Sequence, residues 1–345
     1  MAFAEWWYRA AYLPLQPTVT GFSSQVSFAW ADVLIVAAAA VVVGLWTRPL
    51  ARAAAGRRWR AVATAGWRTL VLASLAYLLF LALWGLSYSR TPLEARLAFD
   101  PARVDGPAVR QLAAASVTGL NGLFGRAHAG RWPGPAELPA VLGPAFAEAQ
   151  RLLGVPGSAV PAAPKRTLLG PYFRRAAIAG FTNPFLLEVM ITPDALPFER
   201  PSILAHEWAH LAGFANEAEA EFVGWVTCML GDDQSRYSGW VSVFPRLPRE
   251  VRAEAARALG AGPRADFAAI RERLQRASPT VTRFAWVGYD RFLRAHRVPE
   301  GVASYDRVVR LIAGTTFDEA WRPRLRHETG THDGVTTGAA PGVTP

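Results

Sequence analysis

The stretch HEWAHLAGFANEAEAEF, residues 206–222, contains the residue types of a catalytic metal centre. His206 and His210 are four positions apart, and residues with this spacing lie one turn above each other on the same face of a helix. Their imidazoles can therefore bind one metal ion. Glu207 lies about 100° further round the helix, where its carboxylate reaches a water beside the metal without being a ligand. The pattern H-E-x-x-H predicts a zinc ion with a general base, the chemistry of metallopeptidases.

A catalytic zinc ion needs a third protein ligand and an open position for water. Gly213 is a natural end for the first helix, and the chain must turn there to return towards the metal. Glu217, Glu219 and Glu221 follow at alternate positions. If Asn216 caps a second helix, Glu219 occupies the third helical position, and the two residues resemble a capping box. Glu217 and Glu221 then share the other face of that helix.

We expect Glu217 to be the third zinc ligand. Glu221 is expected to orient one of the histidines, because a ligating imidazole usually donates its other N–H to a carboxylate or a carbonyl. Glu219 remains an alternative ligand, since both carboxylates can bind zinc.

Other polar residues are candidates for supporting roles. A zinc peptidase needs a hydrogen-bond donor for the oxyanion of its tetrahedral intermediate, and our first candidate is Tyr237, ahead of Tyr289 and Tyr305. Asp290 either orients a ligand or caps a helix. The remaining histidines lack partners at ligand spacing and are interpreted as surface residues; they are His128, His296, His327 and His332.

Two long hydrophobic runs, residues 28–46 and 69–86, precede the motif. Each is long enough, at 1.5 Å per residue, to cross a hydrocarbon core of about 30 Å. Asp32, close to one end of the first run, is the only charged residue in either run. Neither run offers a polar face to water, so both are predicted to be transmembrane helices. Tryptophans near their ends favour the same prediction; they are Trp30, Trp46, Trp67 and Trp84.

The loop between the two runs is rich in arginine and contains no acidic residue. Its arginines are Arg48, Arg52, Arg57, Arg58, Arg60 and Arg68. The positive-inside rule places this loop in the cytoplasm. Residues 1–27 are then an extracytoplasmic tail, residues 28–88 are the two spans with their loop, and the H-E-x-x-H motif lies outside the cytoplasm.

The charge of the chain does not indicate nucleic-acid binding. The 345 residues have a formal net charge of +10, but the arginines are spread along the chain and Lys165 is the only lysine. No basic run alternates with aromatic residues, and no nucleic-acid-binding motif is found. The one cysteine, Cys228, cannot form an internal disulfide, and we expect it to be a small buried hydrophobe.

Periodicity predicts that residues 89–325 form a mainly helical domain with a small sheet, an α+β fold. Helices are expected over 108–126, 136–153, 201–212, 217–230, 250–259, 265–277, 286–295 and 305–312. Two short strands, 176–181 and 187–191, are expected just before the motif, joined by a turn at 182–184. The edge of the second strand could bind an extended peptide, with core packing as an equal alternative. Residues 326–345 are rich in Gly, Thr and Pro and are expected to be a disordered tail.

The motif and three further blocks resemble a family of bacterial membrane proteins, the domain of unknown function 3810. The blocks are GFTNPF (180–185), RYSGW (236–240) and YDRFLRAHRVPEGVASYDRVVRLI (289–312). The resemblance covers most of the chain, spans included. It implies a zincin-like zinc-peptidase domain in a multi-pass protein of the bacterial inner membrane. It also implies that family members often have a further hydrophobic segment before the region that starts here at Glu5.

Residues 217–221 also resemble the E-x-x-A-[DN] element of glutamate-type zinc peptidases, in which the first glutamate is the ligand. Here Glu221 stands where that element has Asp or Asn, and the spacing from His210 to Glu217 is shorter than in most such peptidases.

The expected function is that of a membrane-anchored zinc metallopeptidase, with Zn²⁺ as its cofactor and a peptide or protein as its substrate. A purely structural zinc ion is usually held by four ligands, often cysteines, and would not need Glu207. One alternative is a zincin-like domain that binds zinc or a cell-envelope partner without proteolysis. A transporter subunit is a third interpretation, but it would require polar groups in the spans, and only Asp32 is available.

Overall fold

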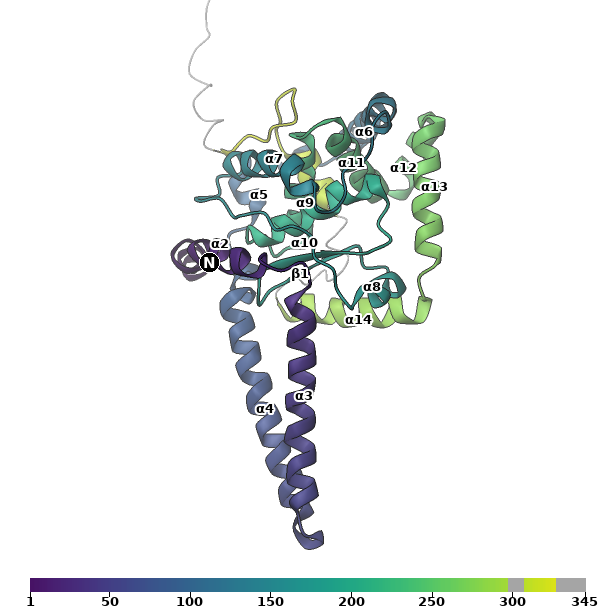
Figure 1. The fold of residues 1–345 in the computed structure, drawn as a ribbon. Coiled ribbons are helices and arrows are strands. Elements are labelled where there is room, and N and C mark those ends of the chain that lie inside the picture. Colours follow the sequence, from purple (N-terminus) through teal and green to yellow (C-terminus); the bar gives the residue numbers. More distant parts are fainter. Residues whose placement is uncertain (297–306, 327–345) are drawn as a thin grey trace, which may run out of the picture.

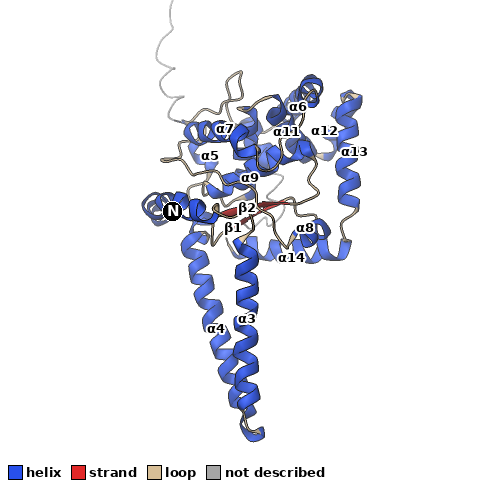
Figure 2. Ribbon diagram, in the orientation of Figure 1, coloured by secondary structure: helices blue, strands red, loops and turns tan. Residues whose placement is uncertain are grey.

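The computed structural model of the protein describes residues 1–296 and 307–326. These residues form a mainly helical domain with one small antiparallel sheet, and a long helical hairpin projects from the domain (Figure 1 and Figure 2). The expected fold class, mainly α with a small β-sheet, is confirmed. Almost all of the expected tail, with His327 and His332, lies outside the described residues.

The projecting hairpin consists of α3 (Trp30–Arg52) and α4 (Arg58–Leu83), which pack against each other. Both helices are long and apolar enough to cross a membrane, and almost none of their apolar surface is buried in the protein. The arginine-rich loop is shorter than expected. Its arginines lie mostly on the ends of the two helices, because α3 continues to Arg52 and α4 begins at Arg58. Arginine and alanine are good helix formers, and α3 continues through Pro49 to its C-cap at Ala53.

Residues 1–27 are not a free tail. They form α1 (Ala2–Trp7), a π-helical turn (Tyr8–Tyr12) and α2 (Leu13–Ser23). Tyr8 and Tyr12 are buried, and their hydroxyls donate to the carbonyl oxygens of Ala212 and Leu211, at 2.7 and 3.0 Å. The N-terminal helices therefore pack onto the end of the motif helix and belong to the domain.

The centre of the domain is a pair of helices, α9 (Arg200–Leu211) and α10 (Glu217–Met229). Three helices pack against this pair, namely α7 (Leu138–Leu152), α11 (Asp233–Val243) and α15 (Arg307–Gly314), and α6 (Gly106–His128) packs in turn on α11 and α15. Large buried aromatic side chains fill the space between them, among them Trp208, Phe222 and Trp225. The helices expected at 108–126, 136–153, 201–212, 217–230 and 305–312 are confirmed to within a few residues, whereas α11 was not expected.

The remaining helices lie further from the centre. They are α5 (Leu93–Arg96), α8 (Gly170–Ala176), α12 (Arg249–Ala255), α13 (Ala261–Gln275) and α14 (Pro279–Ala295). α14 is longer than the helix expected at 286–295, because Ser278 and Pro279 begin it two turns earlier.

The sheet pairs β1 (Gly180–Asn183) with β2 (Glu188–Ile191), in the register Gly180 to Ile191. The first strand begins later than expected, because residues 170–176 form α8, and the turn lies at 184–187. β2 cannot offer a free edge to a peptide, which corrects that prediction. Its second edge is already covered where the amide of Lys165 donates to the carbonyl of Val189, at 2.8 Å.

The first turn of α3 is fixed to the domain by buried charges. Glu188 accepts hydrogen bonds from the amides of Trp30 (2.9 Å) and Ala31 (2.6 Å) and lies 3.0 Å from the ammonium of Lys165. Asp32 accepts from the Thr167 hydroxyl, at 2.7 Å. A carboxylate at a helix N-terminus stabilises the unpaired amides there. Asp32, the one charge in the first hydrophobic run, thus serves the junction between this helix and the domain.

Candidate metal centre

Two glycines bring the helices of the motif close together. Gly213, in the turn after α9, has φ of +83°, and a Cβ there would lie 2.5 Å from the Tyr8 ring. Gly224 lies on the face of α10 that contacts α9, where a Cβ would lie 2.8 Å from the amide nitrogen of His206. Only glycine allows this turn and this approach without displacement. Gly224 is seven residues after Glu217, so the same face of α10 carries both residues towards the histidines.

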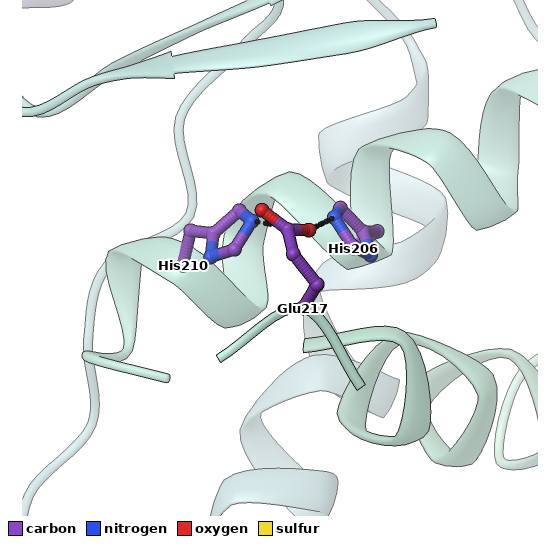
Figure 3. A group of neighbouring side chains, drawn as sticks. All are labelled: His206, His210 and Glu217. Atoms are coloured by element: carbon purple, nitrogen blue, oxygen red, sulfur yellow. Dashed lines mark ion pairs between the residues drawn. The ribbon is translucent and has the colours of Figure 1, made fainter. Parts of the chain in front are cut away.

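His206, His210 and Glu217 meet at the centre of this interface (Figure 3). Glu217 Oε2 is 3.2 Å from Nε2 of His206 and 3.5 Å from Nε2 of His210. The candidate ligand atoms of the three residues all lie within 4.8 Å of one another. The structure therefore brings together the three residues expected from the sequence to bind zinc.

The outer contacts of the histidines define which nitrogens face the cluster: a hydrogen bond for His210 and an ion-pair contact for His206. Nδ1 of His210 lies 2.7 Å from the carbonyl oxygen of Phe214, and Nδ1 of His206 lies 3.2 Å from Glu221 Oε2. Both partners accept hydrogen bonds, so the hydrogen belongs on Nδ1 in each neutral ring. The lone pairs of both Nε2 atoms then point towards Glu217 Oε2. Three electron-pair donors cannot converge without a cation, and nitrogen and oxygen donors of this kind suit zinc. The residues fit a metal ion.

The pKa shifts of the cluster residues also indicate a site that favours a cation. Burial lowers the pKa of His206, but Glu217 and Glu221 raise it, with a net shift well above its ordinary value. Burial raises the pKa of Glu217, but His210 and His206 together hold it well below its ordinary range. The two carboxylates around His206 thus favour positive charge at the cluster, which a metal ion would supply.

Glu207 lies beside the cluster and against the sheet. Its carboxylate accepts a hydrogen bond from the Thr182 hydroxyl, at 2.6 Å. A Cβ on Gly180 would lie 2.4 Å from Glu207 Oε1, so a glycine on β1 makes room for the glutamate. Burial raises the pKa of Glu207, opposed by His206 and His210. Thr182 and Gly180 carry no motif signal of their own in the sequence, although both lie in the GFTNPF block.

The structure separates the two candidate third ligands. Glu219 does not reach the histidines: it accepts a hydrogen bond from the amide of Leu93, at 2.6 Å. It faces a cavity of about 220 Å³ that is also lined by Arg90 and Arg96. Asn216 caps α10 as predicted, and its side chain accepts from the amides of Ala218 and Glu219. The capping box is wrong in its second half, because the carboxylate of Glu219 bonds to Leu93 instead of the Asn216 amide.

The choice of Tyr237 as the oxyanion donor is contradicted by its contacts. Tyr237 is buried, and its hydroxyl donates to Asp266, at 2.5 Å. Burial and Asp266 raise the pKa of Tyr237. Tyr289 lies at the cluster, since its hydroxyl donates to Glu217 Oε1. The position of α14 decides this contact, and no periodicity in the sequence indicates it. Tyr305, the third candidate, lies outside the described residues.

Two histidines interpreted as surface residues are partly buried instead. His128 Nε2 lies 3.0 Å from Asp266, among the rings of Phe124 and Trp132. His296 packs against the rings of several aromatic residues, which are Tyr77, Phe80, Tyr88 and Phe292. Asp290 forms an ion pair with Arg294, at 2.8 Å, one turn further along α14. Cys228 is fully buried, as predicted.

Residues 7–313 match the family described as "Protein of unknown function (DUF3810)", so the chain belongs to that family. The match includes α3, α4 and the whole cluster described above. No curated protein and no solved structure matches the chain.

Proposed function

We propose that this protein is a membrane-anchored zinc metallopeptidase with a zincin-like catalytic domain. The observation that carries the proposal is the convergence of two imidazole Nε2 atoms on a buried carboxylate oxygen of Glu217, with Glu207 on the same helix as the histidines. His206, His210 and Glu217 would hold the ion. Zinc, when bound, polarises a carbonyl group and makes a water molecule more acidic.

The residues around the ion have separate tasks. Glu207 accepts the proton of the attacking water and later transfers it to the leaving amine as the C–N bond breaks. The Thr182 hydroxyl holds the carboxylate of Glu207 in place, at 2.6 Å. Glu221 and the carbonyl of Phe214 orient the two imidazoles, at 3.2 and 2.7 Å. The hydroxyl of Tyr289 positions Glu217 through its hydrogen bond to Oε1.

The proposed location is the bacterial inner membrane, with α3 and α4 as spans. Arginines gather at the end of the hairpin farthest from the domain; they include Arg52, Arg57, Arg58 and Arg60. The positive-inside rule favours the cytoplasm for that end and the opposite side of the membrane for the domain. The substrate would then be a peptide or protein outside the cytoplasm.

Zinc content and peptide hydrolysis test the proposal. The full chain is purified in detergent, and bound zinc is measured for the parent and for the variants His210→Ala and Glu217→Ala. We expect about one zinc ion per parent chain and little in either variant, because each variant removes one of three ligands. Glu207→Gln should keep its zinc but lose hydrolysis of a pool of fluorescence-quenched peptides, typically by a factor of 10² or more.

The matched control is Glu219→Gln, since Glu219 is a partly buried glutamate on α10, like Glu217, but bonds to Leu93 and not to a histidine. It should retain both zinc and hydrolysis. A parent chain that takes up no zinc when zinc is offered would overturn the metal site. Equal hydrolysis by Glu207→Gln and the parent would overturn the peptidase mechanism while leaving the metal site intact.

A further inference from the structure

Helix α14 lies at the end of the domain from which the hairpin projects. Figure 1 shows it running across the direction of α3 and α4 instead of along it. Its C-terminal end packs against α4: the rings of Phe292 and Phe80 lie 5.7 Å apart, and those of His296 and Tyr77 lie 6.2 Å apart. Tyr77 is six residues before the end of α4 at Leu83, which corresponds to about 9 Å along the helix. α14 therefore contacts α4 within its hydrophobic stretch, at some distance from the end of α4 at Leu83.

α14 has two different faces. Its inner face carries Tyr289 to Glu217 and buries Leu293. Its outer face exposes Phe284 (75%) and Val287 (44%). Arg283 and Arg291 are exposed on this helix as well. A helix that exposes large apolar side chains together with arginines is typical of the boundary between lipid headgroups and acyl chains.

A second exposed apolar group adjoins α14 at the same level. α8 packs on α14, and the carbonyl of Arg175 at its C-terminal end accepts a hydrogen bond from the amide of Ser278. Tyr172 on α8 is 44% exposed, and Leu168, just before it, is 78% exposed. The amide of Leu168 donates to Asp32 in the first turn of α3, at 2.8 Å. This segment is therefore fixed at the top of the other hydrophobic helix.

We propose that α14, α8 and residues 166–169 form a surface that rests on the outer leaflet of the bilayer and binds anionic phospholipid headgroups. The inference rests on the part of the proposed function in which α3 and α4 cross the membrane. Both ends of the surface contact a hydrophobic helix near its upper end, so a membrane that encloses the hairpin meets the surface as well. Phe284, Val287, Tyr172 and Leu168 enter the headgroup region, and Arg283 and Arg291 contact lipid phosphates.

Depth-dependent fluorescence quenching tests this surface. The full chain with Cys228→Ala is reconstituted in vesicles of equal parts phosphatidylcholine and phosphatidylglycerol, and single cysteines are labelled with a small fluorophore. The test positions are Phe284→Cys and Leu168→Cys. Because both side chains are exposed, these substitutions should not disturb folding. Leu78→Cys on α4 reports the span itself. Ala265→Cys near the start of α13 is the control, because it is exposed at the end of that helix remote from α14.

Spin-labelled lipids with the label near the headgroup should quench Phe284→Cys and Leu168→Cys several-fold more than Ala265→Cys. Arg283→Gln with Arg291→Gln, or vesicles of phosphatidylcholine alone, should reduce quenching at Phe284→Cys. Quenching that is the same with and without phosphatidylglycerol would overturn the anionic-lipid part of the proposal. Strong quenching of Leu78→Cys by deep labels with none at Phe284→Cys or Leu168→Cys would overturn the surface but keep the spans. No quenching at Leu78→Cys would overturn the membrane anchor of the proposed function, and this surface with it.

Discussion

Glu188 and Glu217 are both buried glutamates that face cationic or basic partners, yet their surroundings differ. Both oxygens of Glu188 are occupied: the amides of Trp30 and Ala31 donate to them, and Lys165 lies 3.0 Å away. In Glu217, Oε1 accepts from Tyr289, but the buried Oε2 has no hydrogen-bond partner among the described residues. The nearest groups are the two imidazole Nε2 atoms.

The comparison distinguishes a buried charge that holds the fold from one that is poised to bind. A buried acceptor without a partner costs free energy, about 1–3 kcal/mol or more if it is charged. The Glu188 cluster does not bear this cost, because every donor and acceptor is matched within the chain. The Glu217 cluster retains it, and a cation between the three donor atoms would remove it.

The largest expected effect is on the stability of the fold, when the buried ion pair of Glu188 and Lys165 is broken. Lys165→Met removes the cation that contacts the fully buried carboxylate of Glu188, which should lower the free energy of unfolding by about 3–5 kcal/mol. Guanidinium unfolding of the full chain in detergent, followed by tryptophan fluorescence, measures the change. The control is Glu272→Gln, which removes an exposed ion pair with Arg276 on α13 and should cost less than about 1 kcal/mol. Equal costs for the two variants would contradict a structural role for Lys165.

The next largest effect is the stabilisation of the fold by zinc, which is expected at the Glu217 cluster and not at Glu188. If the Glu217 cluster binds zinc, zinc at about a hundred times its dissociation constant should stabilise the parent by about 2.7 kcal/mol. Thermal unfolding with zinc and with a chelator measures the difference. Glu217→Ala should lose the response, whereas Glu219→Ala should keep it, because Glu219 bonds to Leu93. A response that survives in Glu217→Ala would show that zinc acts elsewhere on the chain.

The smallest effect tests the approach of α10 to α9. Gly224→Ala places a Cβ 2.8 Å from the amide nitrogen of His206, and overpacking of this kind costs about 1–3 kcal/mol. Since the helices must separate, zinc affinity should fall as well. Gly125→Ala on α6 is the control, because its Cβ meets nothing within 4 Å and alanine favours a helix. Unchanged zinc affinity in Gly224→Ala would mean that the cluster tolerates a wider helix spacing.

Local patterns in the sequence were sufficient for the elements of the fold. The motif helix and the helix capped by Asn216 form within a few residues of their expected bounds, whereas α3 and α4 extend beyond the hydrophobic runs into the arginine-rich loop. Helical periodicity also brought His206 and His210 onto one face, because residues four apart are neighbours on any helix. These are short-range properties that each segment carries with it.

Contacts between distant segments could not be predicted in this way. The turn at Gly213 and the close packing at Gly224 select Glu217 over Glu219 for the cluster, and Glu219 finds its partner at Leu93, far away in the sequence. The placement of α14 brings Tyr289 and not Tyr237 to Glu217, and the N-terminal residues expected as a tail pack through Tyr8 and Tyr12. Hydrophobic periodicity specifies which face of a helix is buried, but not which helix will cover it. The shared face of His206 and His210 was therefore predictable from their spacing, whereas the residues that surround them depended on how the helices pack.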